Sequence, residues 1–492
     1  MLYVRMFFLL LVGLYTSRVV LTALGENDFG VYNVIGGVVA MFSIISGALT
    51  TAVSRFITFQ MGKDDPAQIN KVYSTAVIIQ IILALIVIAF AELLGLWFID
   101  NKMTIDPSRI PAARWVLQFS LLAFVINLMS VPQMAMITAH EKMSAYAYIG
   151  LLDGFLRLGS ALIITFASSD RLILYAALMA AGVMIVRLAY GIYCRKNFPE
   201  SKFNPIFETS LIREMFSFAG WNFIGVTSGV LRDHGGNILV NLFFGPAVNA
   251  ARGMAVQLNG AVQGFVTNFM TAVNPQITKS YAAGDKKYMI SLVMKSSRMS
   301  FYLLFIIALP ILFNTEYLLG LWLKEVPVHT VGFVQLFLIF ALSESLSNPL
   351  ITAQLATGNI CTYQLIVGGL QLLNIPVSYF FLKDGAAPEA TVAVAILISQ
   401  VCLVARLLLL KGMIGIDVRK FFRKVYLSVI SVTVIALIIP FAIRNYLPAG
   451  FAGVIINTAV VLISACLSVL IIGFSKEERD TLYSMIFRRI VR

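Results

Sequence analysis

The stretch TAVSRFIT at residues 51–58 returns 220 residues further along the chain as TAVNPQIT at residues 271–278. Further pairs follow in the same order and at nearly the same spacing: LLGLW at 93–97 and 318–322, Gln118 and Gln335, Pro132 and Pro349, Arg187-Leu188 and Arg406-Leu407. A single pair means little, because apolar helices often resemble one another by chance. With the Gln and Pro pairs of one span counted together, four ordered matches at a nearly constant offset indicate an internal duplication.

The composition places this duplicated chain in a membrane. Apolar residues make up 59% of the 492 residues and charged residues only 12%, which is more apolar surface than a soluble chain can bury. They come in blocks of about 20, the length that crosses a bilayer core of about 30 Å as an α-helix. Gly, Ser, Ala and Pro inside the blocks favour packed helices over barrel strands. We therefore predict an all-α integral membrane protein.

About fourteen blocks qualify as transmembrane helices. We place them at residues 2–24, 31–54, 73–97, 115–137, 144–167, 172–194, 215–242, 248–272, 289–313, 331–352, 361–382, 390–411, 425–443 and 452–474. Six spans per repeat is an even number, so both copies have the same orientation. This predicts two parallel-related six-helix bundles plus two extra C-terminal helices, with a site between the bundles near mid-membrane. The expected domains are 1–197, 198–414, the appended helices at 415–474, and a cytoplasmic interfacial tail at 475–492.

Residues 1–20 could also pass for a signal peptide. Arg18 lies late in this segment, no small-x-small cleavage site follows it, and a second span begins at once. We interpret the segment as the first span. Because it starts without a polar lead-in, the sequence leaves an upstream start open.

Basic residues outside the predicted spans are unevenly distributed. The loops after even-numbered spans and the C-terminal tail carry 23 Lys and Arg, against 7 in the loops after odd-numbered spans. Since cytoplasmic loops are enriched in Lys and Arg, both termini are expected in the cytoplasm. The loops with Lys63, Lys286 and Lys420 should face the cytoplasm, and Arg109 the periplasm. Topology thus explains the net charge of +13, and no nucleic-acid partner is expected.

The repeats and several local segments resemble a known group. The duplicated six-helix halves, the appended pair and the two LLGLW segments look like the MATE-like (MOP) flippase superfamily. Within it, four segments are similar to bacterial Wzx-type lipopolysaccharide and O-antigen exporters: WNF at 221–223, NLFFGP at 241–246, NAARG at 249–253 and SYAAGD at 280–285. This resemblance implies a flippase that moves undecaprenyl-pyrophosphate oligosaccharides from the cytoplasmic to the outer leaflet of the bacterial inner membrane.

All basic residues inside the predicted spans are arginine: Arg5, Arg18, Arg157, Arg187, Arg232, Arg252 and Arg406. A charge at the centre of a span costs at least about 2.5–3.5 kcal/mol, so each needs a partner or a watery cavity. Guanidinium groups stay protonated and match phosphate oxygens with a planar fork. The candidate substrate-binding residues are Arg18, Arg157, Arg232 and Arg252. Arg5, Arg187 and Arg406 lie near span ends, where they can snorkel to the interface, and Arg252 fits either role.

Three deep acids are candidates for ion coupling: Asp153, Asp233 and Glu344. Asp153 lies four residues before Arg157, so the two share a helix face and can pair, which leaves a purely structural role open. Asp233 adjoins Arg232, and the following Gly235-Gly236 indicates close approach of another segment. Glu344 has no neighbouring base in sequence, so it could bind H⁺ or Na⁺, or be a neutral, hydrogen-bonded acid.

Other chemistry is not indicated. There is no phosphate-binding loop of an ATPase, no soluble segment long enough for a catalytic domain, and no Cys/His cluster that predicts a metal site. We expect no enzyme and no cofactor beyond possible H⁺ or Na⁺ coupling. Expected partners are a lipid-linked oligosaccharide on a polyprenyl pyrophosphate, membrane lipids and other polysaccharide-assembly proteins.

Alternative functions stay open. They are a cation-coupled multidrug exporter, a lipid II flippase and a membrane-embedded glycan polymerase or ligase. Span one lacks the acid that drug-exporting relatives place there, and the outer loop at 98–114 is short for a polymerase. Seven span arginines against three deep acids favour an anionic cargo over an organic cation.

Overall fold

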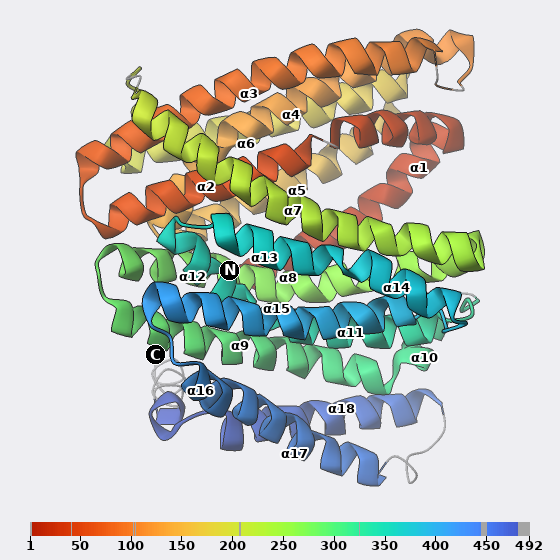
Figure 1. Ribbon diagram of the computed structural model, residues 1–492. Coiled ribbons are helices and arrows are strands. Elements are labelled where there is room, and N and C mark those ends of the chain that lie inside the picture. The colour runs from red at the N-terminus through yellow and green to blue at the C-terminus, as the bar shows by residue number, and fades with distance from the viewer. Residues whose placement is uncertain are drawn as a thin grey trace, which may run out of the picture. The chain divides into compact units, whose positions relative to one another are not determined.

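The computed structural model describes residues 2–40, 42–101, 103, 105–205, 208–323, 325–443 and 450–480. These residues form α-helices with short 3-10 and π turns, and no strand occurs among them (Figure 1). The all-α prediction is confirmed. The chain divides into two compact units: unit 1 is Met1–Thr227 with Thr278–Gly284, and unit 2 is Ser228–Ile277 with Asp285–Arg492.

Unit 1 contains six complete helices. They are α1 (Leu2–Ala40), α2 (Ser43–Gly62), α3 (Pro66–Asn101), α4 (Ile110–Ala139), α5 (Met143–Phe166) and α6 (Arg171–Asn197). Helix α4 packs against α2, α3 and α6, and α5 packs against α1 and α6. A core of small and branched residues, including Val116, Leu117 and Leu172, lies between α1, α4 and α6. Apolar faces on several sides of α4 make it the centre of the unit.

Helix α1 breaks at Gly25, whose φ of 76° and ψ of 169° only glycine adopts readily. Asp28, just after the break, accepts hydrogen bonds from Arg109, which also donates to Asp170 at 2.7 Å. Asp28 lies in α1, Arg109 precedes α4 in a 3-10 turn (Pro107–Arg109), and Asp170 caps the N-terminus of α6. Arg109 therefore clamps three chain segments at one end of unit 1.

Helices α7 (Thr209–Phe244) and α8 (Pro246–Ala282) each belong to both units, because α7 crosses from unit 1 at Ser228 and α8 returns at Thr278. A sharp turn at Gly245, with φ of 82°, joins the two helices. Pro246 then starts α8 at a position where its missing N–H is not needed. These are among the longest helices of the described chain, with 36 and 37 residues.

Unit 2 continues with shorter, broken helices. They are α9 (Lys286–Phe313), α10 (Thr315–Trp322), α11 (Thr330–Ser345), α12 (Asn348–Thr357), α13 (Cys361–Leu372), α14 (Asn374–Lys383) and α15 (Ala390–Ile414). Helices α11 and α12 are apolar and long enough to cross a membrane only when taken together, and they are bent by 40° at the break between them. Pro349 near the start of α12 explains the bend, since proline cannot donate the hydrogen bond that would continue α11.

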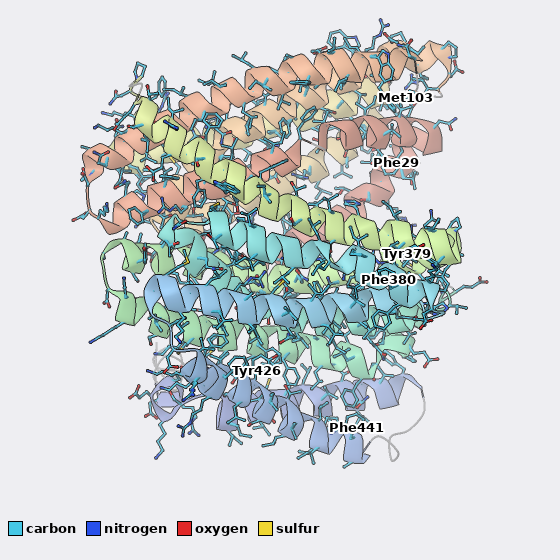
Figure 2. All side chains as sticks on the ribbon, in the orientation of Figure 1. Phe29, Met103, Tyr379, Phe380, Tyr426 and Phe441 are labelled. Carbon is cyan, nitrogen blue, oxygen red and sulfur yellow. The ribbon has the colours of Figure 1, made fainter. Side chains whose placement is uncertain are left out.

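The appended segment forms α16 (Val418–Phe421), a π turn (Phe422–Tyr426), α17 (Leu427–Ile443), α18 (Phe451–Ser468) and a second π turn (Val469–Gly473). Helices α17 and α18 lie side by side and pack on α9 (Figure 1). Tyr426 lies where the first π turn meets α17, and Phe441 lies near the far end of α17 (Figure 2). Of the predicted tail at 475–492, residues 481–492 lie outside the described residues.

Ten helices of the described chain are long and apolar enough to cross a membrane, or eleven if the bent pair α11–α12 counts as one span. The predicted spans at 31–54, 215–242 and 248–272 do not meet this criterion. The first is divided between α1 and α2, and the other two fall on α7 and α8, whose polar residues lower their hydropathy. The count of fourteen therefore stays a prediction. The polar residues of α7 and α8 line a cavity, which is described below.

Candidate functional site

A cavity of about 400 Å³ lies inside unit 2, between α7, α8, α9, α11 and the start of α12. Four amide side chains line it: Asn237, Asn259, Gln263 and Asn348. Four charged groups line it as well: Arg232, Asp233, Arg252 and Glu344. A polar cavity among apolar helices explains why α7 and α8 carry residues that hydrocarbon would not tolerate. Four of the seven predicted site residues therefore lie around one cavity.

Arg252 on α8 is the most buried charged residue of the cavity, with 5% of the residue exposed. Its guanidinium donates to the side-chain oxygen of Asn237 and, at 3.3 Å, to the backbone carbonyl of Asp233. The ring of Phe337 lies 5.3 Å away, within cation–π distance. The Nε atom is buried and has no hydrogen-bond partner. Arg252 does not snorkel to an interface; it is held inside the unit with one donor unused.

The two glycines after His234 make this arrangement possible. A Cβ atom on Gly236 would lie 2.6 Å from a terminal nitrogen of Arg252, and one on Gly235 would lie 2.7 Å from Ile375. The predicted close approach at Gly235-Gly236 is thus confirmed. The absence of a side chain at Gly236 gives the guanidinium its place against α7.

Arg232 on α7 forms an ion pair with the adjacent Asp233, whose carboxylate lies 2.9 Å from Arg232 Nε. Phe340 on α11 lies 5.0 Å from the guanidinium. The Arg232 side chain is 14% exposed and that of Asp233 is 62% exposed. The pair therefore has a buried cationic end and an open anionic end.

Glu344 on α11 accepts a hydrogen bond of 2.6 Å from the hydroxyl of Ser399 on α15. Ser399 bonds to Ser343 at 2.8 Å, Gln400 donates to Ser343, and the Tyr426 hydroxyl donates to Gln400. A polar chain therefore connects the cavity to the base of α17, where Tyr426 lies (Figure 2).

Glu344 has no base beside it in sequence, but two arginines from other helices lie in its surroundings. Glu344 interacts electrostatically with Arg232 and with Arg406 of α15. Arg406 is 1% exposed and hydrogen-bonds with the buried Tyr363. The predicted snorkelling of Arg406 is therefore not observed. Arg232 and Arg406 thus place two positive charges in the surroundings of Glu344.

The remaining predicted residues, Arg18, Arg157 and Asp153, lie in unit 1. Arg157 and Asp153 pair on α5, with Nε and a carboxylate oxygen 3.0 Å apart, as the four-residue spacing predicts. Half of the Arg157 side chain is exposed, and Arg18 on α1 is exposed. None of the residues that line the unit 2 cavity comes from unit 1.

Sequence reasoning missed the amide groups of the cavity and the part played by Arg406. The signal for the first was a polar stripe on α8, formed by Arg252, Asn259, Gln263 and Thr267 at helical spacing. The signal for Arg406 was its place in the sequence repeat, where Arg406-Leu407 matches Arg187-Leu188. Both signals are visible in the sequence, but only packing shows that the amides line one cavity and that Arg406 is buried in the surroundings of Glu344.

Comparison with known proteins is consistent with this architecture. The structure is similar to a MATE transporter in its straight conformation (TM-score 0.72, 11% identity, 84% of this chain and 95% of that one). It is also similar to an outward-facing multidrug resistance MATE family transporter of the MOP superfamily (0.71, 12%, 84% and 94%). A third similar structure is a MOP superfamily transporter from Pyrococcus furiosus (0.71, 11%, 84% and 94%), whose binding pocket is described as having reverse polarity.

The chain therefore has the fold of a multi-pass membrane transporter of the MATE type. Residues 6–281 match the family model named Polysaccharide biosynthesis protein, so the chain belongs to that family. A search of curated proteins found no match.

Proposed function

We propose that this protein is a flippase that moves a lipid-pyrophosphate-linked oligosaccharide from the inner to the outer leaflet of the bacterial inner membrane, for lipopolysaccharide, O-antigen or capsule biosynthesis. The observation that carries the proposal is the buried Arg252, which lines a polar cavity and keeps an unused Nε donor. Membership in the polysaccharide biosynthesis family supports a glycan-related cargo.

The cavity chemistry fits two parts of such a cargo. Guanidinium groups of Arg232 and Arg252 match the oxygens of a diphosphate. The amides of Asn237, Asn259 and Gln263 can donate to and accept from sugar hydroxyls. A volume of about 400 Å³ lies within the usual range of about 300–1,000 Å³ for small-molecule sites. The cavity would hold the diphosphate and the adjoining sugar while the polyprenyl chain stays in lipid.

Arg18 and Arg157 of unit 1 remain in the proposal as further phosphate contacts. In this scheme both units present guanidinium groups to the cargo during a cycle, and both termini lie in the cytoplasm. Glu344, with Asp233 and Asp153, is the candidate for H⁺ or Na⁺ coupling. The polar chain from Glu344 to Tyr426 offers a route by which its charge state could affect α17.

A multidrug exporter is the second candidate, since the exposed carboxylate of Asp233 and that of Glu344 line the same cavity. The structural similarity to a multidrug MATE transporter also favours it. The two functions differ in the sign of the charge that the cargo carries. An anionic cargo needs Arg232 and Arg252, and an organic cation needs the two acids.

The test is glycan export in a strain that lacks the gene and carries variants of it. Arg252→Gln should abolish surface glycan and cause lipid-linked oligosaccharide to accumulate, while Arg252→Lys restores export in part because it keeps the charge without the fork. Arg55→Gln is the burial-matched control, since Arg55 is 9% exposed in unit 1. It should leave export intact.

Three outcomes would contradict the proposal. One is normal export by an Arg252→Gln, Arg232→Gln double variant that inserts at the wild-type level. Another is equal loss of export in Arg55→Gln, which would indicate a general folding defect. The third is efflux of organic cations that depends on Asp233 and Glu344 with no change in surface glycan, which would favour the drug exporter.

A further inference from the structure

A second cavity, of about 620 Å³, lies in unit 2 away from the first. It is bounded by the first half of α9, by α16 with the π turn after it, and by residues 475–478 after α18. Six cationic side chains line it: Lys287, Lys295, Arg298, Lys420, Lys424 and Lys476. Only two acids line it, Glu477 and Glu478. The transport mechanism proposed above uses none of these residues.

The walls of this cavity are fixed by specific contacts. Arg298 pairs with Glu478 at 2.8 Å and donates to the Gly473 carbonyl at 3.2 Å, which ties α9 to the end of the α18 segment. The hydroxyl groups of Tyr302 and Ser428 lie 2.8 Å apart and tie α9 to α17. Arg298 Nε is buried without a hydrogen-bond partner. Helix α9 is thus bound to the appended helices at two places.

The five lysines repel one another. Lys287, Lys295 and Arg298 share one face of α9 with Ser291, at intervals of three and four residues. Lys420 and Lys424 lie four residues apart on the opposite wall. Glu478 pairs with Arg298, and among the described residues none of the five lysines forms an ion pair. The five lysines are exposed to solvent, and two like-charged walls around one cavity create a positive potential that attracts an anion.

The position of Lys287 strengthens this conclusion. It lies in the first turn of α9, where the backbone N–H groups and the helix dipole already present positive charge. Acidic residues are favoured in such a turn, but the first turn of α9 has none. The nearest acid is the N-cap Asp285, whose side chain accepts from the Tyr288 N–H at 2.9 Å. A lysine at this position adds to the positive potential.

The cavity lies at the ends of three membrane spans, because Lys286–Phe313 and Val418–Ile443 begin beside it and Phe451–Gly473 ends beside it. Span ends lie at the depth of lipid headgroups. Ile290 and Met294 give the cavity an apolar wall as well. A ligand that fits must therefore combine a compact anion with an apolar tail.

We propose that this basic cavity binds the phosphate of a membrane lipid, and that binding it is a function of the appended helices. Anionic phospholipid and polyprenyl diphosphate both combine a phosphate group with an apolar tail. The first would make the cavity a lipid-sensing site, and the second would make it the place where cargo is first captured. The site is separate from the Arg232 and Arg252 cavity, so it does not depend on the proposed transport mechanism.

The test measures lipid binding by the purified full-length protein in phosphatidylcholine nanodiscs. One series is doped with phosphatidylglycerol and the other with undecaprenyl pyrophosphate, and native mass spectrometry counts the retained lipid. The triple variant Lys295→Gln, Lys420→Gln, Lys424→Gln should lower affinity for one or both by roughly 30- to 100-fold, since three phosphate-facing charges are lost. The matched control is Lys63→Gln, Lys142→Gln, Lys196→Gln, three exposed lysines of unit 1, and it should change affinity by less than about twofold.

Two further measurements keep the test decisive. A triple Lys→Arg variant at the same positions should bind as wild type does, and wild-type binding should weaken as salt is raised. Loss in the phosphatidylglycerol series identifies a phospholipid site, and loss only in the pyrophosphate series identifies a cargo-capture site. The proposal is overturned if the Gln triple variant binds both lipids within twofold of wild type, if the unit 1 control loses as much, or if wild-type binding does not respond to salt.

Discussion

Both units carry arginine within their membrane helices, but the two sets lie in different surroundings. In unit 1, Arg18 is exposed, and Arg157 is half exposed and paired with its helical neighbour Asp153. In unit 2, Arg252 and Arg406 are 5% and 1% exposed and are held by partners from other helices. A charge is buried only where several helices contribute polar groups to it. Unit 2 therefore surrounds its span arginines with polar partners from other helices, whereas Arg18 and Arg157 of unit 1 stay largely exposed.

The matched prolines show the same difference. Pro132 lies inside the continuous helix α4 of unit 1, and its repeat partner Pro349 stands near the start of α12 after a 40° bend. The bend is next to Glu344 and Asn348, both of which line the cavity. The sequence repeat predicts equivalent positions for the two prolines, and of the two only Pro349 stands beside a helix break and a polar site.

The largest effect should come from Arg406, compared with its repeat partner Arg187. Arg406→Met removes a counter-charge from Glu344 and should lower the free energy of unfolding by about 3 kcal/mol. Arg187→Met should cost less than about 1 kcal/mol, because Arg187 is only half buried. Thermal unfolding in detergent measures both. Adding Glu344→Gln to Arg406→Met should recover part of the loss, and equal losses for the two single variants would remove the distinction between the units.

A smaller effect is expected at Gly236. Alanine there meets the guanidinium of Arg252 at 2.6 Å, and the flexible side chain can move away. Stability should change little, but export should fall roughly tenfold because the phosphate-binding group is displaced. Gly159→Ala on α5 is the unit 1 control, since nothing lies within 4 Å of its added Cβ. Normal export by Gly236→Ala would mean that the position of Arg252 is unimportant.

The Arg109 clamp predicts a modest pH effect confined to unit 1. Burial alone would raise the pKa of Asp170, but hydrogen bonds from Arg109 and from the N–H groups of Ile173 and Leu172 outweigh it and hold the pKa below its ordinary value. The clamp therefore stabilises the fold above about pH 4 and is lost as pH falls through the lowered pKa. Asp170→Asn should cost about 1 kcal/mol or less at pH 7. The difference in melting temperature from wild type should shrink as the pH is lowered toward 3, and a constant difference would contradict this assignment.

The smallest effect on stability should come from the pair on α5. Asp153→Asn with Arg157→Gln preserves shape and removes both charges of a pair that is largely exposed, so the free energy of unfolding should change by less than about 0.5 kcal/mol. If Arg157 binds cargo as proposed, export falls while stability does not. Full export by this stable double variant would show that the pair has a structural role only.

Much of the fold could be predicted from hydropathy, because apolar blocks of membrane length have few alternatives to a helix. Helices α3, α5 and α6 contain the predicted spans at 73–97, 144–167 and 172–194, except that α5 ends at Phe166. The i,i+4 pair of Asp153 and Arg157 also follows from local geometry alone. The break at Gly25 and the burial of Arg406 do not, since both depend on neighbours far away in the sequence. The charged residues of the candidate site could be predicted from the sequence. That they line one cavity could not, because it depends on how the helices pack.

The central claim is that guanidinium groups of unit 2 bind an anionic, lipid-linked glycan during its passage across the bilayer. The most direct measurement is flipping by purified protein in proteoliposomes that carry a labelled polyprenyl-pyrophosphate oligosaccharide, with an impermeant lectin reporting the glycan that reaches the outer leaflet. Wild-type protein and Arg55→Gln should flip the lipid at similar rates, and Arg232→Gln with Arg252→Gln should reduce the rate to that of protein-free liposomes. A double variant that flips at the wild-type rate would contradict the account.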